Sequence, residues 1–173
     1  MNLKGITMKN ILITGGAGLV GTVLTQGLKD KYNVKILDIK KAEGVESHTG
    51  DISNLDSIMP AFKNIDTVVH LAGDRRVHGE WESILDNNII GLYNIYEAAR
   101  LSGVKRVIFA SSQHATGGFY DVEPYSFISK GEFEKLPNDY KPLDETCRIR
   151  PDSFYGASTV SYTHLRAHET SWN

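Results

Sequence analysis

The chain has 173 residues, of which 40% are hydrophobic and 23% charged, and its formal net charge is −2. This length suits one α/β domain, and the apolar share is sufficient for a packed core. The slight acidity argues against a nucleic-acid surface, and no apolar run approaches the roughly 20 residues of a membrane span. Cys147 is the only cysteine, which excludes an internal disulfide and a multi-cysteine metal site. Because the sequence shows no secretion signal, we expect a cytoplasmic location.

Predicted strands alternate with predicted helices from residue 8 onward. Residues 1–7 are interpreted as a non-native or disordered leader, since Met8 stands just before the first apolar run. Apolar and β-branched runs predict strands at 11–14, 33–37, 67–71 and 106–110, and a brief third strand is expected at 48–51. Helices are predicted from residue 20, from 53 to about 62 and from 81 to 102. This alternation is typical of βαβ units, so we predict an α/β fold, a doubly wound parallel sheet with helices on both faces.

Two of these helices carry more detailed predictions. In the first, Val20, Val23, Leu24 and Leu28 share one apolar face. In the third, an interior glycine at position 91 costs about 1 kcal/mol against alanine, so we expect another group to approach closely there.

The alternation disappears between residues 113 and 151. Four of the five prolines and several aromatic residues fall in this segment. A loop of this length in a compact domain is usually a functional lid or a disordered insert. We interpret residues 113–151 as a lid or pocket wall.

Glycine recurs at every third residue directly after the first predicted strand. Small residues at Gly15 and Gly18 let the main chain approach a pyrophosphate, and Gly21 lets the following helix pack closely on the strand. The helix start offers free N–H groups and a partial positive charge to phosphates, so Leu19 and Val20 belong to the same predicted site. An ordinary glycine turn is the alternative interpretation.

An aspartate follows at the end of the second predicted strand. The carboxylate of Asp38 can accept hydrogen bonds from both ribose hydroxyls of NAD, and it would repel the 2′-phosphate of NADP. The predicted cofactor is therefore NAD, unless Asp38 is a surface residue without this role.

Further candidates lie where the next strands end, which is where doubly wound sheets bind ligands. Asp51 and Ile52 close the third predicted strand and are expected to flank the adenine. Leu71, Ala72 and Gly73 close the fourth and place small residues beside the cofactor.

Hydroxyl groups follow the fifth strand and the long loop. Ser112 ends the fifth strand, and Tyr155 comes after the loop. A serine and a tyrosine hydroxyl near a nicotinamide suit proton transfer coupled to hydride transfer at a carbinol carbon. Taken singly, Ser112 can equally be a strand cap and Tyr155 a surface aromatic residue.

Together these motifs resemble the extended short-chain dehydrogenases/reductases, the NAD-dependent epimerase/dehydratase family. The resemblance covers residues 8–158, interpreted as an NAD-binding Rossmann domain. It is carried by the turn at 14–21, Asp38, Asp51-Ile52, HLAG at 70–73, NIIG at 88–91, FASS at 109–112 and YGAS at 155–158. Residues 88–100 and the corner at 112–114 are most similar to uronate dehydrogenases, which oxidise the anomeric carbon of a hexuronate to a lactone.

The resemblance implies a role for several residues. Tyr155 would be the general base, Ser112 the hydroxyl that orients the substrate, and Asn88 a support for the proton relay. Gln113 and His114 would contact the substrate.

Two features differ from the uronate enzymes. Arg75 stands where those enzymes have a serine that helps to hold the sugar acid. Its guanidinium can pair with a substrate carboxylate or belong to a solvated basic turn. The insert between Ser112 and Tyr155 is also longer than in those enzymes.

The end of the chain departs from the family as well. The resemblance implies a lysine four residues after the tyrosine, where the chain has Thr159. Residues 160–170 (VSYTHLRAHET) resemble the translated read-through of a sequencing-library adapter, so residues 159–173 are interpreted as an adapter-derived tail. The helical spacing of His164 and His168 is therefore not taken as a metal site, and no metal is predicted. Family chains continue with further strands and a substrate region, so we expect an inactive N-terminal fragment whose strand at 106–110 is an uncovered sheet edge.

The resemblance thus implies an oxidoreductase that moves a hydride from a carbinol carbon of a sugar or sugar acid to NAD. A nucleotide-sugar epimerase or dehydratase, which uses NAD transiently, is one alternative. A non-catalytic dinucleotide-sensing protein is the other. The expected partner is a small sugar or sugar acid, with no nucleic acid and no membrane, and the resemblance adds a homodimer formed through the helix at 81–102.

Overall fold

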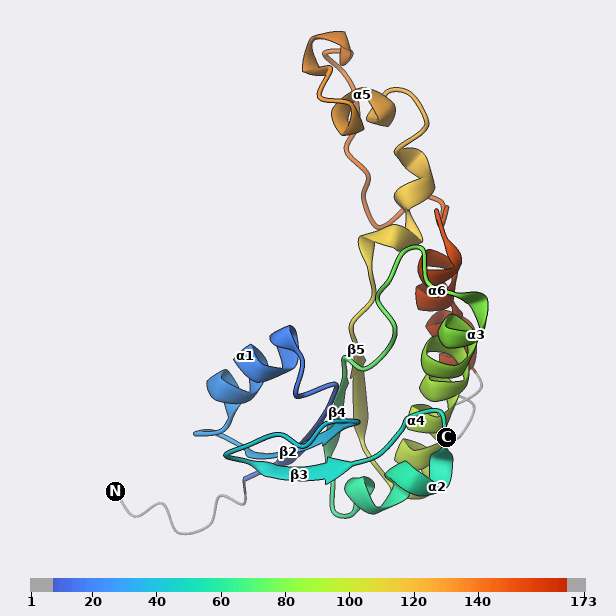
Figure 1. Ribbon diagram of the computed structural model, residues 1–173. Helices are drawn as coiled ribbons and strands as arrows, with labels where there is room; N and C mark the ends of the chain where they lie inside the picture. Colours follow the sequence, from blue (N-terminus) through green and yellow to red (C-terminus); the bar gives the residue numbers. More distant parts are fainter. Residues whose placement is uncertain (1–7, 168–173) are drawn as a thin grey trace, which may run out of the picture. The chain divides into compact units, whose positions relative to one another are not determined.

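The computed structural model describes residues 8–167 (Figure 1). They divide into two compact units, which we call the first unit (residues 8–74 and 82–110) and the second unit (residues 75–81 and 111–167). The expected leader at 1–7 and part of the expected tail, with His168, lie outside the described residues, as does the side chain of His164.

A parallel sheet of five strands forms the centre of the first unit. Its strands are β1 (Asn10–Thr14), β2 (Asn33–Asp38), β3 (Glu46–Thr49), β4 (Thr67–His70) and β5 (Arg106–Phe109), in the order β3-β2-β1-β4-β5. All four strand pairs are parallel. The predicted α/β parallel sheet is confirmed, and the third strand begins at Glu46 instead of His48.

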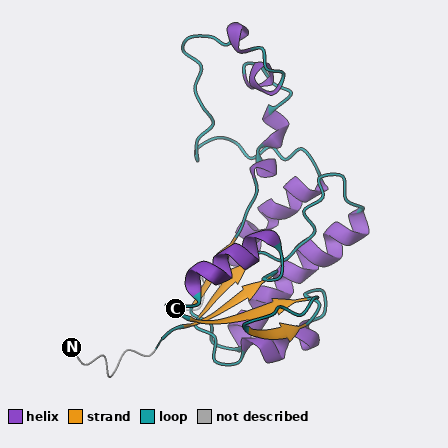
Figure 2. Cartoon of the chain, turned by 60° about the vertical axis from the view of Figure 1, so that its left-hand side comes forward, coloured by secondary structure: helices purple, strands orange, loops and turns teal. Residues whose placement is uncertain are grey.

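Helices cover both faces of this sheet (Figure 2). They are α1 (Leu19–Leu28), α2 (Leu55–Ile58) with the 3₁₀ turn η1 (Met59–Phe62), α3 (Trp81–Ile84), the π-helical segment η2 (Leu85–Ile90) and α4 (Gly91–Leu101). Asn54 caps α2, because its side chain accepts a hydrogen bond from the Ser57 amide. The predicted long helix is confirmed as three consecutive segments, α3, η2 and α4.

The hydrophobic core lies between the sheet and the helices α2 and α4. Leu12, Leu37 and Val68 of the sheet pack with residues of the helices, including Phe62 and Ile95. The predicted close approach at Gly91 is also confirmed. A Cβ there would lie 2.7 Å from Cδ1 of Ile52, so any larger side chain would displace a core residue.

The apolar face predicted for α1 is only partly its buried face. Val20 and Val23 are 63% and 69% exposed, whereas Leu24 and Leu28 are half-buried and share one side of the helix with the buried Gly21 and Thr25. The reason is local. Only a residue without a side chain allows α1 to approach the turn that precedes it, so Gly21 sets which side of the helix faces inward.

The strand β5 is an edge of the sheet, as expected. In the described part of the chain it pairs with β4 alone. Ile13, Ile36 and Ile108 lie in one row across neighbouring strands of the sheet. Their exposed fraction is 0% at Ile13 and 2% at Ile36, but rises to 48% at Ile108 on the edge strand. An open strand edge with an exposed isoleucine is a site of potential aggregation.

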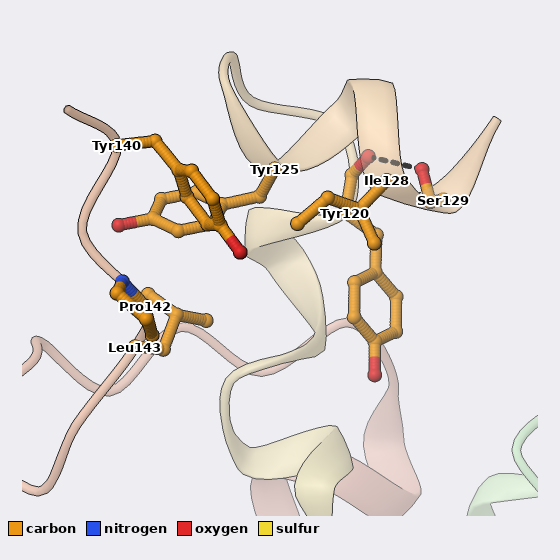
Figure 3. Close-up of a pocket in the computed structure, with 7 residues that line it drawn as sticks. All are labelled: Tyr120, Tyr125, Ile128, Ser129, Tyr140, Pro142 and Leu143. Carbon is orange, nitrogen blue, oxygen red and sulfur yellow. Dashed lines mark hydrogen bonds between the residues drawn. The ribbon is translucent and has the colours of Figure 1, made fainter. Parts of the chain in front are cut away.

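The second unit is more ordered than the sequence predicts. The segment 113–151 contains the short helices η3 (Gln113–Ala115), η4 (Gly117–Phe119), α5 (Tyr125–Ser129) and η5 (Phe133–Lys135). Side chains of α5 and of the neighbouring loops line a cavity of about 350 Å³ that belongs to this segment (Figure 3); the lining residues are Tyr120, Tyr125, Ile128, Ser129, Tyr140, Pro142 and Leu143. The role of the segment as a lid or pocket wall stays a prediction.

The last described helix, α6 (Phe154–Ala167), carries Tyr155. Ser153 precedes it and caps it, because its hydroxyl oxygen accepts a hydrogen bond from the Gly156 amide at 3.0 Å. Helical structure continues through residues 159–167 of the expected tail, whose proposed origin stays a prediction. None of the described helices is both long enough and apolar enough to cross a membrane.

Candidate functional site

The glycine turn joins β1 to α1 through main-chain contacts. Gly15 has a φ of +68°, which favours glycine, and its carbonyl accepts a hydrogen bond from the Gly18 amide at 3.1 Å. A Cβ on Gly15 would lie 2.8 Å from the Ala72 amide nitrogen, and one on Gly21 would collide with the Gly15 carbonyl oxygen. The turn can therefore close only with glycine at both positions.

The outer side of the turn is open. A Cβ on Gly18 would meet only the Gly15 carbonyl oxygen, at 3.2 Å, and Leu19 is 82% exposed. Because α1 begins at Leu19, the first N–H groups of the helix have no acceptor within the helix. The structure thus provides a main-chain cradle with the partial positive charge of a helix start, which suits a phosphate group.

The carboxylate of Asp38 lies beside this turn. One oxygen accepts a hydrogen bond from the Ala17 amide at 3.0 Å, and the other accepts one from the Lys40 amide at 3.0 Å. Each carboxylate oxygen keeps a second lone pair, so the group can also accept hydroxyl donors. The predicted pairing of the glycine turn with Asp38 is therefore present within the first unit.

A buried hydrogen bond joins β1 to β4 beneath the turn. The Thr14 hydroxyl lies 2.6 Å from Nδ1 of His70, and Thr14 Oγ1 accepts from the amides of Leu71 and Ala72 at 3.3 Å. The His70 ring also contacts the Phe109 ring in a tilted arrangement at a centroid distance of 5.6 Å. Burial lowers the pKa of His70 to about 4, because the charged imidazolium is poorly solvated there.

This burial predicts a pH-dependent stability. His70 stays neutral in the folded chain while the unfolded chain takes up a proton below pH 6.5, so stability is complete above that pH and falls toward pH 4. We expect a loss of about 3 kcal/mol from His70 across this range, measured by urea unfolding at several pH values. His70→Gln should flatten this slope, whereas His48→Gln on β3 should keep it. An unchanged slope in His70→Gln would exclude His70 as its source.

Asn88 holds the turn after β4 from the π-helical segment η2. Its Oδ1 accepts a hydrogen bond from the Asp74 amide at 2.6 Å, and its Nδ2 donates to the Asp74 carbonyl at 2.8 Å. A Cβ on Gly73, whose φ is +153°, would lie 2.9 Å from the same Oδ1. Asn88 therefore fixes the main chain at Asp74, directly after the predicted cofactor residues 71–73, and its role in a proton relay stays a prediction.

Asp51 and Ile52 are largely engaged in local structure. The Asp51 carboxylate accepts hydrogen bonds from the amide and hydroxyl of Ser53 at 2.9 and 2.8 Å. Ile52 is 6% exposed, and its carbonyl accepts a hydrogen bond from Asn94. The expected contact of these two residues with adenine stays a prediction.

The residues assigned to catalysis and substrate binding belong to the second unit, apart from Asn88. Ser112 caps η3, because its hydroxyl oxygen accepts a hydrogen bond from the His114 amide at 3.2 Å. The His114 ring contacts the Tyr155 ring edge-on, with centroids 5.7 Å apart. The structure thus brings Ser112, His114 and Tyr155 together at the start of η3 and α6.

Two predicted substrate contacts lie on the surface of the second unit. The side chains of Arg75 and Gln113 are exposed. Nearby in sequence, the Trp81 ring contacts the Phe154 ring in a tilted arrangement with a centroid distance of 5.2 Å, which ties residues 75–81 to the start of α6. The roles of Arg75 and Gln113 stay predictions.

Sequence reasoning missed Asp152, whose Oδ2 lies 2.6 Å from Nδ1 of His114. The two residues are 38 positions apart, and no spacing rule connects them. The only available signal was local, since an aspartate and a serine at positions 152 and 153, just before Phe154 and Tyr155, form a helix-start pattern. Within the described residues, no group of three or more His, Cys, Asp or Glu side chains could hold a metal ion.

Comparison with known sequences identifies the family. The profile of the NAD dependent epimerase/dehydratase family matches residues 11–168. The chain belongs to this family. The resemblance inferred from the glycine turn, Asp38 and Tyr155 is thereby confirmed.

Relatives within the epimerase/dehydratase family include several sugar dehydrogenases. The chain is 34% identical to an L-arabinose 1-dehydrogenase (NAD(P)(+)) of Haloferax volcanii, over 88% of this chain and 58% of the relative. It is 35% identical to the uronate dehydrogenase of Pseudomonas putida, over 86% of this chain and 50% of the relative. The chain therefore spans about half the length of these relatives.

Solved structures of the family have the same fold. The uronate dehydrogenase of Agrobacterium tumefaciens superposes with a TM-score of 0.75 at 30% identity, covering 95% of this chain and 57% of the enzyme. A point mutant of that enzyme complexed with NAD superposes equally well, with a TM-score of 0.75 at 29% identity over 96% of this chain and 57% of the enzyme. The family is NAD-dependent, and the main-chain cradle at Gly15–Gly21 with Asp38 beside it fits that cofactor.

Proposed function

We propose that this chain carries the NAD-binding part of a sugar dehydrogenase of the uronate dehydrogenase type. The observation that carries the proposal is the glycine turn, open on its outer side, with the Asp38 carboxylate hydrogen-bonded to the Ala17 amide within it. The amides of Gly18, Leu19 and Val20 would bind the diphosphate, and Asp38 would accept the ribose hydroxyls. When bound, NAD supplies the acceptor for a hydride.

The second unit supplies the groups for the proton. In the proposed reaction the carbinol carbon loses a hydride and its hydroxyl loses a proton, so the carbinol becomes a carbonyl, which is a lactone for a hexuronate. Tyr155 takes the hydroxyl proton as general base, and Ser112 orients the same hydroxyl. Gln113, His114 and Arg75 contact the remaining sugar, with the Arg75 guanidinium suited to a carboxylate.

A nucleotide-sugar epimerase or dehydratase is the alternative within the family. Sequence identity supports the dehydrogenase only slightly, at 35% for uronate dehydrogenase against 31% for the UDP-glucose 4-epimerase of Streptomyces lividans. The relative affinity of the chain for a free hexuronate and a nucleotide sugar distinguishes the dehydrogenase from the epimerase. In the presence of NADH, the dehydrogenase proposal predicts that the chain binds D-glucuronate more tightly than UDP-glucose. The reverse order would favour the epimerase.

Asp38→Ala tests the cofactor assignment. Removing an ionised acceptor from the ribose hydroxyls costs roughly 1.5–3 kcal/mol, so NADH binding should weaken about 10- to 100-fold. NADPH binding should change much less, because the same variant removes the repulsion of the 2′-phosphate. Fluorescence titration with both nucleotides measures this difference.

Two further variants serve as controls. Asp38→Asn keeps an acceptor for the Ala17 amide but lacks the charge, which separates support of the turn from recognition of the ribose. Asp139→Ala removes an exposed carboxylate of the second unit and should change neither titration. Equal losses of NADH and NADPH binding in Asp38→Ala would contradict the assignment of Asp38.

The cytoplasmic location and the homodimer stay predictions.

A further inference from the structure

A histidine and an aspartate form a short contact next to the proposed general base. Oδ2 of Asp152 lies 2.6 Å from Nδ1 of His114, and the two side chains are only about one-fifth exposed, at 21% and 22%. The imidazole ring of His114 in turn contacts the Tyr155 ring at 5.7 Å and an interplanar angle of 61°. Asp152 is therefore connected to Tyr155 through the imidazole ring of His114, which contacts both residues.

Main-chain hydrogen bonds hold the segments that carry His114 and Asp152 next to each other. The Arg150 amide donates to the Ala115 carbonyl at 3.0 Å, and the Gly118 amide donates to the Arg150 carbonyl at 2.8 Å. These bonds join the segment after His114 to the segment before Asp152. The pair is therefore part of a fixed backbone arrangement and not a chance contact of two long side chains.

Two glycines make the close approach possible. A Cβ on Gly117 would collide with the Asp152 carboxylate, and a Cβ on Gly156 would collide with the His114 carbonyl oxygen. The Gly117 position leaves space for the carboxylate, and the Gly156 position brings α6 against η3. Both positions are needed for the observed geometry of His114 and Asp152.

The Asp152 carboxylate is ionised at neutral pH. Partial burial raises the pKa of Asp152, but hydrogen bonds from His114 and Ser153 outweigh this effect and hold the pKa below its ordinary value. An ionised carboxylate can only accept hydrogen bonds, so Nδ1 of His114 must carry the proton of the short contact. In a neutral imidazole, Nε2 is then an acceptor.

We propose that Asp152 is a positioning residue that fixes His114 in the Nδ1–H tautomer beside Tyr155, so that Nε2 accepts a hydrogen bond from a hydroxyl group of a polyhydroxylated substrate. The proposal rests on the proposed function, which assigns His114 to substrate binding. It deepens that function by assigning His114 to a sugar hydroxyl and not to the carboxylate, because an acceptor nitrogen repels a carboxylate oxygen.

Nitrogen NMR of the histidine rings in the chain as it exists tests the tautomer. At pH 7.5 the ring of His114, assigned by loss of its signals in His114→Gln, should show a protonated Nδ1 and an unprotonated Nε2. Asp152→Ala removes the acceptor, so the Nδ1–H signal should be lost in favour of Nε2–H. Asp152→Asn and Asp152→Glu keep an acceptor oxygen and should keep the Nδ1–H form.

A matched control shows whether loss of another aspartate in the second unit also changes the signals of the His114 ring. Asp144 is another aspartate of the second unit, and its carboxylate accepts hydrogen bonds from Thr146 instead of a histidine. Asp144→Ala should leave the His114 signals unchanged. An Nε2–H tautomer in the unaltered chain, or an unchanged tautomer in folded Asp152→Ala, would overturn the proposal.

Substrate titration tests the second half of the proposal. With NADH present, D-glucuronate should shift the Nε2 signal of His114, and Asp152→Ala should bind D-glucuronate about tenfold more weakly, since one hydrogen bond is lost. NADH affinity should not change in this variant. An unshifted Nε2 signal alongside normal NADH binding would refute the role of His114 while sparing the NAD assignment, whereas failure to bind NADH would refute the proposed function itself.

Discussion

Gly21→Ala is expected to reduce NADH binding by more than about 100-fold and to destabilise the first unit by about 1–3 kcal/mol. The added methyl would collide with the Gly15 carbonyl oxygen and with Gly16 Cα. Because both neighbours are main chain, neither can move aside without opening the turn. An opened turn no longer presents the amides of the first turn of α1 to a diphosphate. Fluorescence titration with NADH and urea unfolding measure the two effects.

The same helix offers a matched control. A Cβ built on Gly27, which is also in α1, would meet no atom within 4 Å apart from its chain neighbours and the backbone of its own helix. Gly27→Ala should therefore leave NADH binding unchanged and stabilise the chain by about 0.5–1 kcal/mol, since alanine favours a helix over glycine. If Gly21→Ala bound NADH as well as Gly27→Ala does, the glycine turn would not be the phosphate site.

The second large expected effect is that the chain binds the cofactor but does not catalyse oxidation of a hexuronate. Thr159 stands where the resemblance implies a lysine, and it is 4% exposed, with its hydroxyl donating to the Gly156 carbonyl of its own helix at 2.9 Å. The hydroxyl of Thr159 carries no positive charge, so it cannot stabilise a tyrosinate as a lysine ammonium group would. The chain should therefore bind NADH yet form no measurable NADH from NAD and D-glucuronate or D-galacturonate.

The variant Tyr155→Phe shows whether any turnover that is observed depends on Tyr155. If the chain turns over a hexuronate and Tyr155→Phe abolishes that turnover, Thr159 is sufficient and the inferred need for a lysine is wrong. Activity that survives in Tyr155→Phe would instead contradict the role of Tyr155 as general base.

The sheet and the glycine turn could be predicted because each depends on a local pattern. Runs such as 11–14 and 67–71 are short and rich in apolar and β-branched residues, which is typical of strands buried on both faces. The close approach at Gly91 was predictable for the same kind of reason, since an interior glycine weakens a helix unless something packs against it.

The buried side of α1 could be predicted only in part from hydrophobic periodicity, which identified the half-buried Leu24 and Leu28. Val20 and Val23 satisfy the helical pattern, yet contact with the turn is made through Gly21, whose small size matters more than its hydrophobicity. Periodicity reports which residues share a face, but close main-chain packing decides which face turns inward.

The surroundings of Tyr155 depended on contacts between distant positions. The pairing of His114 with Asp152 follows from main-chain hydrogen bonds across a segment whose short helices carry no clear periodicity. Family resemblance pointed to His114 as a substrate contact, but only the fold shows which group holds its imidazole.

An amide NMR titration of the chain with NADH tests the central claim most directly. If the diphosphate binds at the open side of the glycine turn, the largest chemical-shift changes should fall on the amides of Gly18, Leu19 and Val20, with smaller changes near Asp38. Unchanged signals at these amides, with the largest changes elsewhere in the chain, would contradict the account.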